Sequence, residues 1–156
     1  MQITPLQIAR MTAAVANRGT LYKPLFVKEV KLIGEDPVYT GDPTPVSTLD
    51  FAPGVFDAIQ TAMCDVTLDT TGTARFIFEP WYEYQGDEVI VCGKTGTAQT
   101  GGATTPPQAW FVAYAPSDKP RIAVAVIIER SGHGSNVAGP IVKEMITAYL
   151  SKNPSL

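Results

Sequence analysis

The first hydrophobic pattern of the chain has helical spacing and starts almost at the first residue. Thr4 can cap a helix, Pro5 suits the first helical position, and Gln7 can bond back to the cap. We expect a helix over residues 5–17, with Gly19 ending it in a left-handed conformation. The stripe that should be buried consists of Leu6, Ala9, Ala13 and Ala16, with Met11 and Val15 beside it.

The middle of the chain, residues 26–86, changes pattern several times. Residues 26–33 alternate loosely and are rich in β-branched side chains, which predicts a strand. Residues 34–47 contain three Pro and two Gly, which predicts a loop or a peripheral hairpin. Helical spacing returns after Pro53 and ends at the polar cluster 69–72. Residues 73–86 carry several aromatic side chains, which we interpret as a short helix and an aromatic flap over the core.

The last third of the chain predicts a sheet and one more helix. Strands are expected over residues 89–99, 108–115 and 121–129, and the short turn at 116–120 makes the last two antiparallel neighbours. Residues 100–107 predict a mobile loop that borders a site. A final helix, capped by Ser135 and with Pro140 about one turn in, should pack on the sheet. The predicted fold class is α/β of the α+β type, an antiparallel sheet packed by helices.

Composition narrows the class of protein. The 156 residues are 45% hydrophobic, which suits one globular domain, and 12 basic against 15 acidic residues leave a net charge of -3. The basic residues are scattered, so we expect no nucleic-acid partner. The longest apolar run, residues 122–128, is far shorter than the roughly 20 residues that cross a bilayer, so we expect no membrane segment in this chain. We expect no metal or cofactor, and we interpret Cys64 and Cys92 as separate buried thiols.

The candidate chemistry lies in residues 92–99. Lys94 supplies a positive charge, and Thr95 and Thr97 share one face of the strand, where their hydroxyls can bind a carboxylate. Gly96 leaves room for a close backbone approach, so an extended peptide could add to the strand edge. By alternation Lys94 points away from the two threonines. It therefore reaches the same site only at an exposed edge, or serves a partner on the other face.

Two other interpretations of this segment compete. Gly93-Lys94-Thr95 resembles the end of a phosphate-binding loop, but that motif needs a Gly where this chain has Glu88. It also needs a helix after Lys94, which Gly96 disfavours. Taken alone, the segment could instead be a solvated strand with ordinary β-forming threonines.

The segment does not stand alone, and the chain resembles the penicillin-binding protein transpeptidases of the high-molecular-weight class. This family also includes serine β-lactamases, and its three signatures are Ser-x-x-Lys, Ser-x-Asn and Lys-Thr-Gly. Lys94-Thr95-Gly96, extended by residues 97–99, is similar to the third. Residues 4–7, 72–74, 109–116 and 122–126 also resemble family segments, in the family's order. The resemblance implies a partial transpeptidase or β-lactamase-like fold over residues 1–156.

The resemblance also implies a role for each site residue. Lys94 belongs to the hydrogen-bonded network around the nucleophile, and the backbone N–H of Thr97 is half of an oxyanion hole. Thr95 and Thr97 bind the carboxylate of a peptidoglycan stem peptide ending in D-Ala-D-Ala, or of a β-lactam. Gly96 keeps the path clear, Trp110 lies on the next strand, and both are expected among the substrate-binding residues. Two residues stand outside these roles: Gln108 departs from the family's usual His, and His133 is expected as an exposed loop residue.

The nucleophilic serine is missing from this sequence. None of the six serines is followed three positions later by lysine, and Ser151-Lys152-Asn153, which matches Ser-x-Asn, lies at the wrong end of the chain. We therefore expect the missing N-terminal half of the domain to carry both signatures, and this chain alone to form no acyl-enzyme. The parent protein is expected outside the cytoplasm, held to the cell membrane by a region absent here. Alternatives are a serine β-lactamase or carboxypeptidase, and a non-catalytic β-lactam-binding or complementing module.

Overall fold

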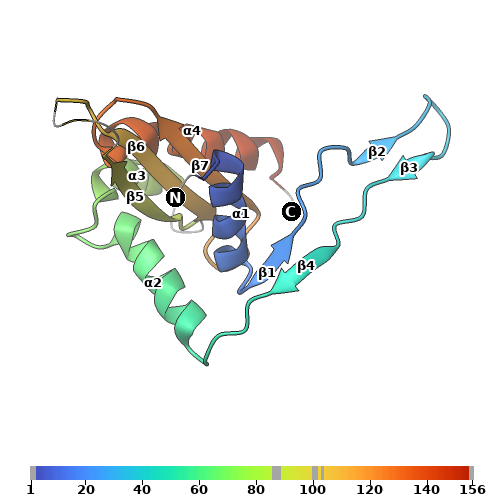
Figure 1. Cartoon of the computed structure of the whole chain (residues 1–156), viewed down its shortest axis with the longest axis horizontal. Helices are drawn as coiled ribbons and strands as arrows, with labels where there is room; N and C mark the ends of the chain where they lie inside the picture. Colours follow the sequence, from blue (N-terminus) through green and yellow to red (C-terminus); the bar gives the residue numbers. More distant parts are fainter. Residues whose placement is uncertain (1–2, 86–88, 100–101, 103, 155–156) are drawn as a thin grey trace.

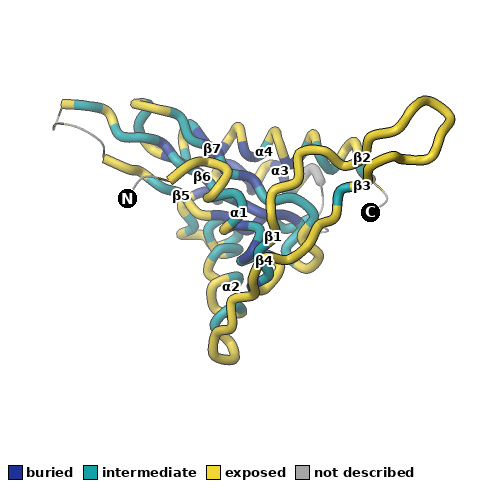
Figure 2. The backbone as a smooth tube through the Cα atoms, turned by 45° about the vertical axis from the view of Figure 1, so that its right-hand side comes forward, coloured by how far each residue is buried: buried dark blue, intermediate teal, exposed yellow. Residues whose placement is uncertain are grey.

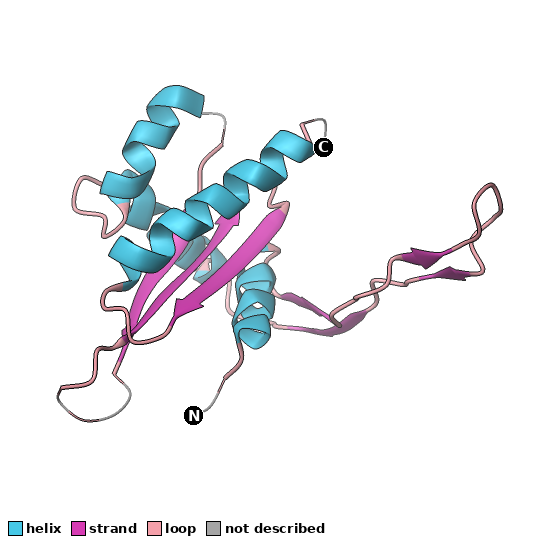
Figure 3. Ribbon diagram, turned by 90° about the horizontal axis from the view of Figure 1, so that it is seen from above, coloured by secondary structure: helices cyan, strands magenta, loops and turns pink. Residues whose placement is uncertain are grey.

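The computed structural model describes residues 3–85, 89–99, 102 and 104–154 and contains a three-stranded antiparallel sheet between two layers of helices (Figure 1). The strands are β5 (Cys92–Ala98), β6 (Gln108–Ala115) and β7 (Ile122–Ile128), in the order β5-β6-β7. Helix α4 (Gly134–Lys152) lies across one face of the sheet (Figure 3), with α3 (Arg75–Gln85) beside it. Helices α1 (Pro5–Ala16) and α2 (Val55–Leu68) contact the sheet from its other side. The predicted fold class is confirmed.

Helix α1 begins where the sequence predicts and buries a different face. Thr4 and Gln7 form the capping box, with the Thr4 amide donating to Gln7 Oε1 at 2.8 Å. The predicted stripe is only partly right, because the buried residues are Thr12, Ala14 and Ala16, whereas Leu6 is half exposed. Periodicity identifies an apolar face but not the neighbour that covers it, and the Leu6 side of α1 has no cover among the described residues.

A long two-stranded arm follows α1 and extends away from the sheet (Figure 2). It consists of β1 (Thr20–Tyr22) paired with β4 (Pro45–Thr48), and of β2 (Glu29–Val30) paired with β3 (Tyr39–Thr40). The loop or hairpin predicted over residues 34–47 is therefore partly right, because these residues form one side of a longer hairpin that starts at Thr20. The strand predicted over residues 26–33 shrinks to two paired residues. Its alternating apolar side chains remain exposed, because no other layer of the described chain covers them.

The sheet begins later and runs more regularly than the sequence predicts. Strand β5 starts at Cys92, not Val89, because side chains and not a neighbouring strand bond the backbone of Val91. The register pairs Lys94 with Val112 and Gly96 with Trp110. The turn at 116–120 makes β6 and β7 antiparallel neighbours, as predicted. Part of the loop predicted over residues 100–107, namely 100, 101 and 103, lies outside the described residues.

The main core lies between the sheet and the α3–α4 layer. Phe78 of α3, Phe111 of β6 and Ile146 of α4 are fully buried there. Helix α4 starts one residue before the predicted cap: His133 is the N-cap residue and Ser135 lies inside the helix. The Ser135 hydroxyl instead donates to Asn136 Oδ1 at 3.3 Å, so the capping prediction was wrong.

A disulfide joins Cys64 of α2 to Cys92 of β5, which corrects the expectation of two separate thiols. The two residues are 28 positions apart in the sequence, and neither lies in a recognisable spacing motif. Pairing depends on α2 packing against the start of β5, and local pattern does not report that contact. The disulfide ties the strand with the candidate chemistry to a helix in the opposite layer from α4.

Candidate functional site

The candidate site is the outer edge of the sheet. Strand β5 has β6 on one side and no strand on the other, within the part of the chain that the structure describes. Lys94 and Thr97 are exposed, and Thr95 and Gly96 are half-buried, so the segment is neither inside the core nor helical. The groups that the sequence singles out are therefore accessible at an open sheet edge.

The register separates the charged and hydroxyl groups as alternation predicts. Lys94 and Gly96 face the same side as their partners Val112 and Trp110. Thr95 and Thr97 face the other side, opposite Phe111 and Ala109. Lys94 Nζ donates to the backbone oxygen of Thr95 at 2.5 Å, which holds the ammonium beside the strand itself. The ammonium of Lys94 and the hydroxyls of Thr95 and Thr97 thus belong to one short stretch of strand but lie on opposite faces of the sheet.

A third hydroxyl, that of Thr73, reaches the site from the segment between α2 and α3. Thr73 Oγ1 lies 3.1 Å from Thr95 Oγ1. In the sequence, residues 72–74 are recognisable only through the family resemblance, and no pattern predicts a role for Thr73. A Cβ on the neighbouring Gly72 would lie 2.4 Å from the Asp65 oxygen and 2.6 Å from the Val66 oxygen. The segment thus packs tightly on the end of α2, and this packing fixes where Thr73 stands.

The turn before Thr73 is closed by a carboxylate. Asp69 Oδ1 accepts hydrogen bonds from the Thr71 amide at 2.7 Å and from the Thr71 hydroxyl at 2.6 Å. These bonds stabilise the ionised form and hold the pKa of Asp69 below its usual value. The turn that presents Thr73 is therefore built from local hydrogen bonds.

Glycines allow α4 to pack directly on the backbone beneath the site. A Cβ on Gly134, the first residue of α4, would lie 2.1 Å from the Trp110 oxygen and 2.4 Å from the Gly96 oxygen. A Cβ on Gly96 would lie 3.0 Å from Trp110 Cβ. The helix start, the Lys-Thr-Gly strand and the Trp110 strand are consequently in backbone contact.

An apolar groove of about 510 Å³ opens on the Lys94 and Trp110 face of the sheet. Its floor is formed by β5, β6 and β7, and its wall by the beginning of α1. The lining residues are Ile3, Ile8, Met11, Lys94, Thr95, Gly96, Ala98, Gln108, Trp110, Val112 and Ile127. The groove places an apolar surface next to the ammonium of Lys94.

The structure gives positions for Gln108 and His133, two residues to which the family resemblance assigns no role. Gln108 Oε1 accepts a hydrogen bond from the Arg130 amide at 3.0 Å, which ties the start of β6 to the residues after β7. His133 is exposed at the N-cap of α4, as expected, and its side chain makes no capping bond.

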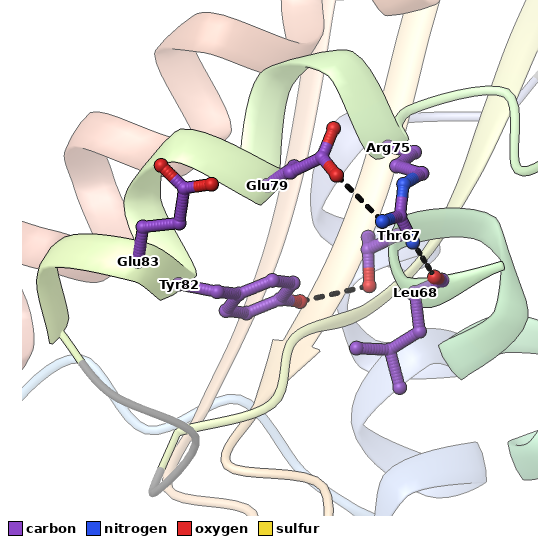
Figure 4. A pocket seen from close by; sticks show the side chains of 6 residues that line it. All are labelled: Thr67, Leu68, Arg75, Glu79, Tyr82 and Glu83. Carbon is purple, nitrogen blue, oxygen red and sulfur yellow. Dashed lines mark hydrogen bonds and ion pairs between the residues drawn. The ribbon is translucent and has the colours of Figure 1, made fainter. Parts of the chain in front are cut away.

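A second cavity, of about 320 Å³, lies between α2 and α3 and is lined mainly by polar side chains (Figure 4). Arg75 binds Glu79 at 2.5 Å and also donates to the Leu68 oxygen, while Tyr82 and Thr67 meet at its inner end. Within the described ranges, no group of three His, Cys, Asp or Glu side chains could hold a metal ion. The same part of the chain contains no helix long and apolar enough to cross a membrane.

Comparison with known proteins gives consistent relatives over nearly the whole chain. Residues 1–147 match the family model of the penicillin-binding protein transpeptidase domain. The chain is 32% identical to the peptidoglycan D,D-transpeptidase MrdA of Haemophilus influenzae, over 96% of this chain and 24% of that protein. It is also 32% identical to the peptidoglycan D,D-transpeptidase PbpA of Mycolicibacterium smegmatis, over 95% of this chain and 29% of that protein.

Solved structures agree with these relatives. The crystal structure of Pseudomonas aeruginosa PBP2 in complex with WCK 5153 matches with a TM-score of 0.75 and 36% identity, over 96% of this chain and 31% of that one. The imipenem acyl-enzyme of penicillin-binding protein A from M. tuberculosis matches with a TM-score of 0.74 and 30% identity, over 95% and 31%. This chain therefore spans less than a third of each of these four proteins, and it belongs to the penicillin-binding protein transpeptidase domain family.

Proposed function

We propose that this chain supplies the substrate-binding strand of a serine-type peptidoglycan D,D-transpeptidase. The observation that carries the proposal is the open edge of β5, where Thr95 and Thr97 share one face and Lys94, on the other face, keeps its ammonium against the backbone oxygen of Thr95. Such an edge suits an extended peptide that ends in a carboxylate, because the hydroxyls can donate to the carboxylate and the ammonium attracts it. The ligands are a stem peptide ending in D-Ala-D-Ala, or a β-lactam.

The reaction is acyl transfer through a serine that this sequence does not contain. That serine attacks the carbonyl of the penultimate D-Ala, the terminal D-Ala leaves, and the amine of a second stem peptide takes the acyl group. The backbone N–H of Thr97 donates to the oxyanion, and Lys94 joins the hydrogen-bonded network around the serine. Trp110 flanks the strand on the Lys94 face, and Gly96 leaves the approach to the strand open.

Residues 1–156 form the C-terminal part of one transpeptidase domain, and the N-terminal part carries Ser-x-x-Lys and Ser-x-Asn. The groove between α1 and the sheet supports this division, since it leaves apolar side chains such as Met11 uncovered beside Lys94. A helix of the N-terminal part that packs in the groove would bring its serine to the site from the Lys94 side. Lys94 then serves this partner on its own face of the sheet, while the threonines serve the substrate.

The longer protein acts outside the cytoplasm and is anchored to the cell membrane by a region that precedes these residues. The disulfide between Cys64 and Cys92 supports this location, because disulfides persist in oxidising compartments and are rare in the cytosol. The two relatives named as peptidoglycan D,D-transpeptidases support it as well.

Covalent labelling by a fluorescent penicillin tests the proposal. We expect no labelling of residues 1–156 alone, and labelling of the longer protein that includes the preceding segment. Thr97→Val in that protein should lower the acylation rate by about 10- to 100-fold, the effect of losing one hydrogen bond to a charged group. Thr40→Val, an exposed strand threonine on the arm, is the matched control and should leave the rate unchanged.

The outcomes separate the alternatives. Labelling of residues 1–156 alone would show that a nucleophile is present and would overturn the assignment of roles. Rapid release of the label by water, without transfer to an amine, would instead indicate a β-lactamase or a carboxypeptidase. Tight reversible binding without labelling of either protein would indicate a non-catalytic β-lactam-binding module.

A further inference from the structure

The start of β5 is held by side chains at a point where a neighbouring strand would normally hold it. Val91 lies three residues before Lys94, is fully buried, and precedes the first residue that pairs with β6. In a hydrogen-bonded antiparallel pair, the N–H and C=O of one residue both bond to the residue opposite. For Val91, the hydroxyls of Thr67 and Tyr82 take the place of that opposite residue.

The three groups form a closed ring of hydrogen bonds. The Val91 amide donates to Tyr82 Oη at 3.1 Å, and Thr67 Oγ1 donates to the Val91 oxygen at 2.5 Å. Tyr82 Oη and Thr67 Oγ1 are 2.8 Å apart, and Figure 4 draws this bond. When the Thr67 proton goes to the Val91 oxygen, the tyrosine hydroxyl must be the donor of this bond, which closes the ring. Each hydroxyl has one proton to give, and this arrangement uses both.

Burial gives the ring its strength. Thr67 and Val91 are 0% exposed, so the hydrogen bond between them is shielded from water. Burial also raises the pKa of Tyr82, which keeps its hydroxyl protonated and able to donate. Removing the Tyr82 hydroxyl leaves the buried Val91 amide without its partner, and removing the Thr67 hydroxyl leaves the Val91 oxygen only the longer contact of 3.4 Å to Tyr82 Oη. Either loss weakens the attachment of the strand.

A second attachment comes from the same face of α2. Cys64 and Thr67 are three residues apart on the helix and therefore adjacent on its surface. Cys64 binds Cys92 covalently, and Thr67 binds Val91, so one helical face holds two consecutive residues of the chain that enters β5. The outer edge of β5 beyond this point has no strand to fix it within the described chain, so its position depends on how its start is held.

We propose that Thr67 and Tyr82 are positioning residues for the Lys94–Thr97 strand. They touch no substrate and act by setting the place and direction of β5 through Val91. The proposal rests on the proposed function for its catalytic consequence, because a strand shifted by about 1 Å can slow an enzyme by about 100-fold. Its structural half, that the ring orders β5, stands on the hydrogen bonds alone.

The test uses the longer protein that contains this chain, with two readouts. Hydrogen exchange followed by mass spectrometry reports the protection of backbone amides in residues 91–97, and a fluorescent penicillin reports the acylation rate. Thr67→Val removes the hydroxyl and keeps the shape, and Tyr82→Phe provides a second variant that loses only an oxygen. We expect faster exchange in residues 91–97, and acylation slower by about 10- to 100-fold, for both.

Two further variants separate positioning from general stability. Thr67→Ser keeps the hydroxyl and should restore both protection and rate. Thr147→Val removes a half-buried threonine hydroxyl of α4 that accepts from Trp81 Nε1 at 3.0 Å, and it has no contact with β5 through that group. It should lower stability without slowing acylation.

Several results would overturn the proposal. These are equal acylation rates in Thr67→Val and Thr147→Val at matched stability, a serine variant as slow as the valine variant, or unchanged exchange in residues 91–97. If the unchanged protein takes up no penicillin, the proposed function fails instead. The exchange comparison alone then decides whether the ring orders the strand.

Discussion

Replacing Gly134 with alanine has two opposite effects on stability, because it raises helix propensity and creates a steric clash. Gly134 is the first residue of α4, and alanine stabilises helices relative to glycine by at most about 1 kcal/mol. The added Cβ, however, would lie 2.1 Å from the Trp110 oxygen and 2.4 Å from the Gly96 oxygen. Both obstacles are backbone atoms of adjacent sheet strands, so no side-chain rotation relieves the contact.

The start of α4 must therefore move away from β5 and β6, or the two strands must move. Overpacking of this kind costs about 1 to 3 kcal/mol, which exceeds the gain in propensity. For a chain of this size, each kcal/mol corresponds to a change in melting temperature of roughly 2 to 4 °C. A clash this close to two backbone oxygens belongs to the upper end of the overpacking range, so about 2 kcal/mol remains after the gain in propensity, and we expect Gly134→Ala to lower the melting temperature of the chain by roughly 4 to 8 °C.

Thermal unfolding followed by far-UV circular dichroism measures this change, with Gly102→Ala as control because a Cβ there would meet nothing within 4 Å. A Gly134→Ala chain as stable as the control, or more stable, would refute the claim that α4 rests on the backbone of the candidate site. Since Gly96 lies in the Lys-Thr-Gly strand, the same substitution in the longer protein should also slow acylation.

Three further substitutions test the forces around the sheet. Tyr114→Phe should leave the free energy of unfolding unchanged or raise it by up to about 1 kcal/mol, because the buried Tyr114 hydroxyl has no partner among the described residues; urea denaturation measures this. Cys64→Ser, which leaves Cys92 unpaired, should lower that free energy by about 3 to 4 kcal/mol, the entropy of opening a loop of this length, and a reducing agent should abolish the difference. The hydrogen bond and charge of Arg18 lower the pKa of Asp57, so the contribution of this pair to stability is present at neutral pH and lost as pH falls through the lowered pKa. Asp57→Asn should therefore weaken the chain at pH 7 but not near pH 2, and 1 M salt should shrink the difference because the pair is exposed.

The sequence predicts the elements near the site better than the contacts between them. Strand β6 matches its predicted range because its apolar pattern and its flanking Pro residues both mark its ends. The capping box at Thr4 places the start of α1 in the same way, through residues that interact locally. Both features depend on interactions between residues close in the sequence. A sequence pattern predicts such local interactions directly.

The missed features depend on residues far apart in the sequence. The disulfide needs α2 to lie against β5, and Thr73 reaches Thr95 only because Gly72 lets its segment pack on the end of α2. The wrong stripe on α1 has a related cause. Met11 and Leu6 are apolar as a buried face should be, but both are about half exposed, and Met11 lines the groove beside Lys94. Helical periodicity is the same whether such a face is covered by this chain or by another segment.

The contacts of β5 explain how an edge strand, with a neighbouring strand on one side only, can still have a fixed position. An edge strand lacks half of the hydrogen bonds that order a central strand, and its free side is the side that must receive a peptide. Here the contacts that fix the strand come from the two helical layers, so its free side stays open. Cys64 and Thr67 of α2 bind the start of the strand, and Gly134 of α4 packs against the backbone of Gly96. Order at the edge thus comes from the two helical layers, and for this reason substitutions at Thr67 of α2 or Gly134 of α4 should affect the proposed peptide binding, although neither residue is proposed to contact the peptide.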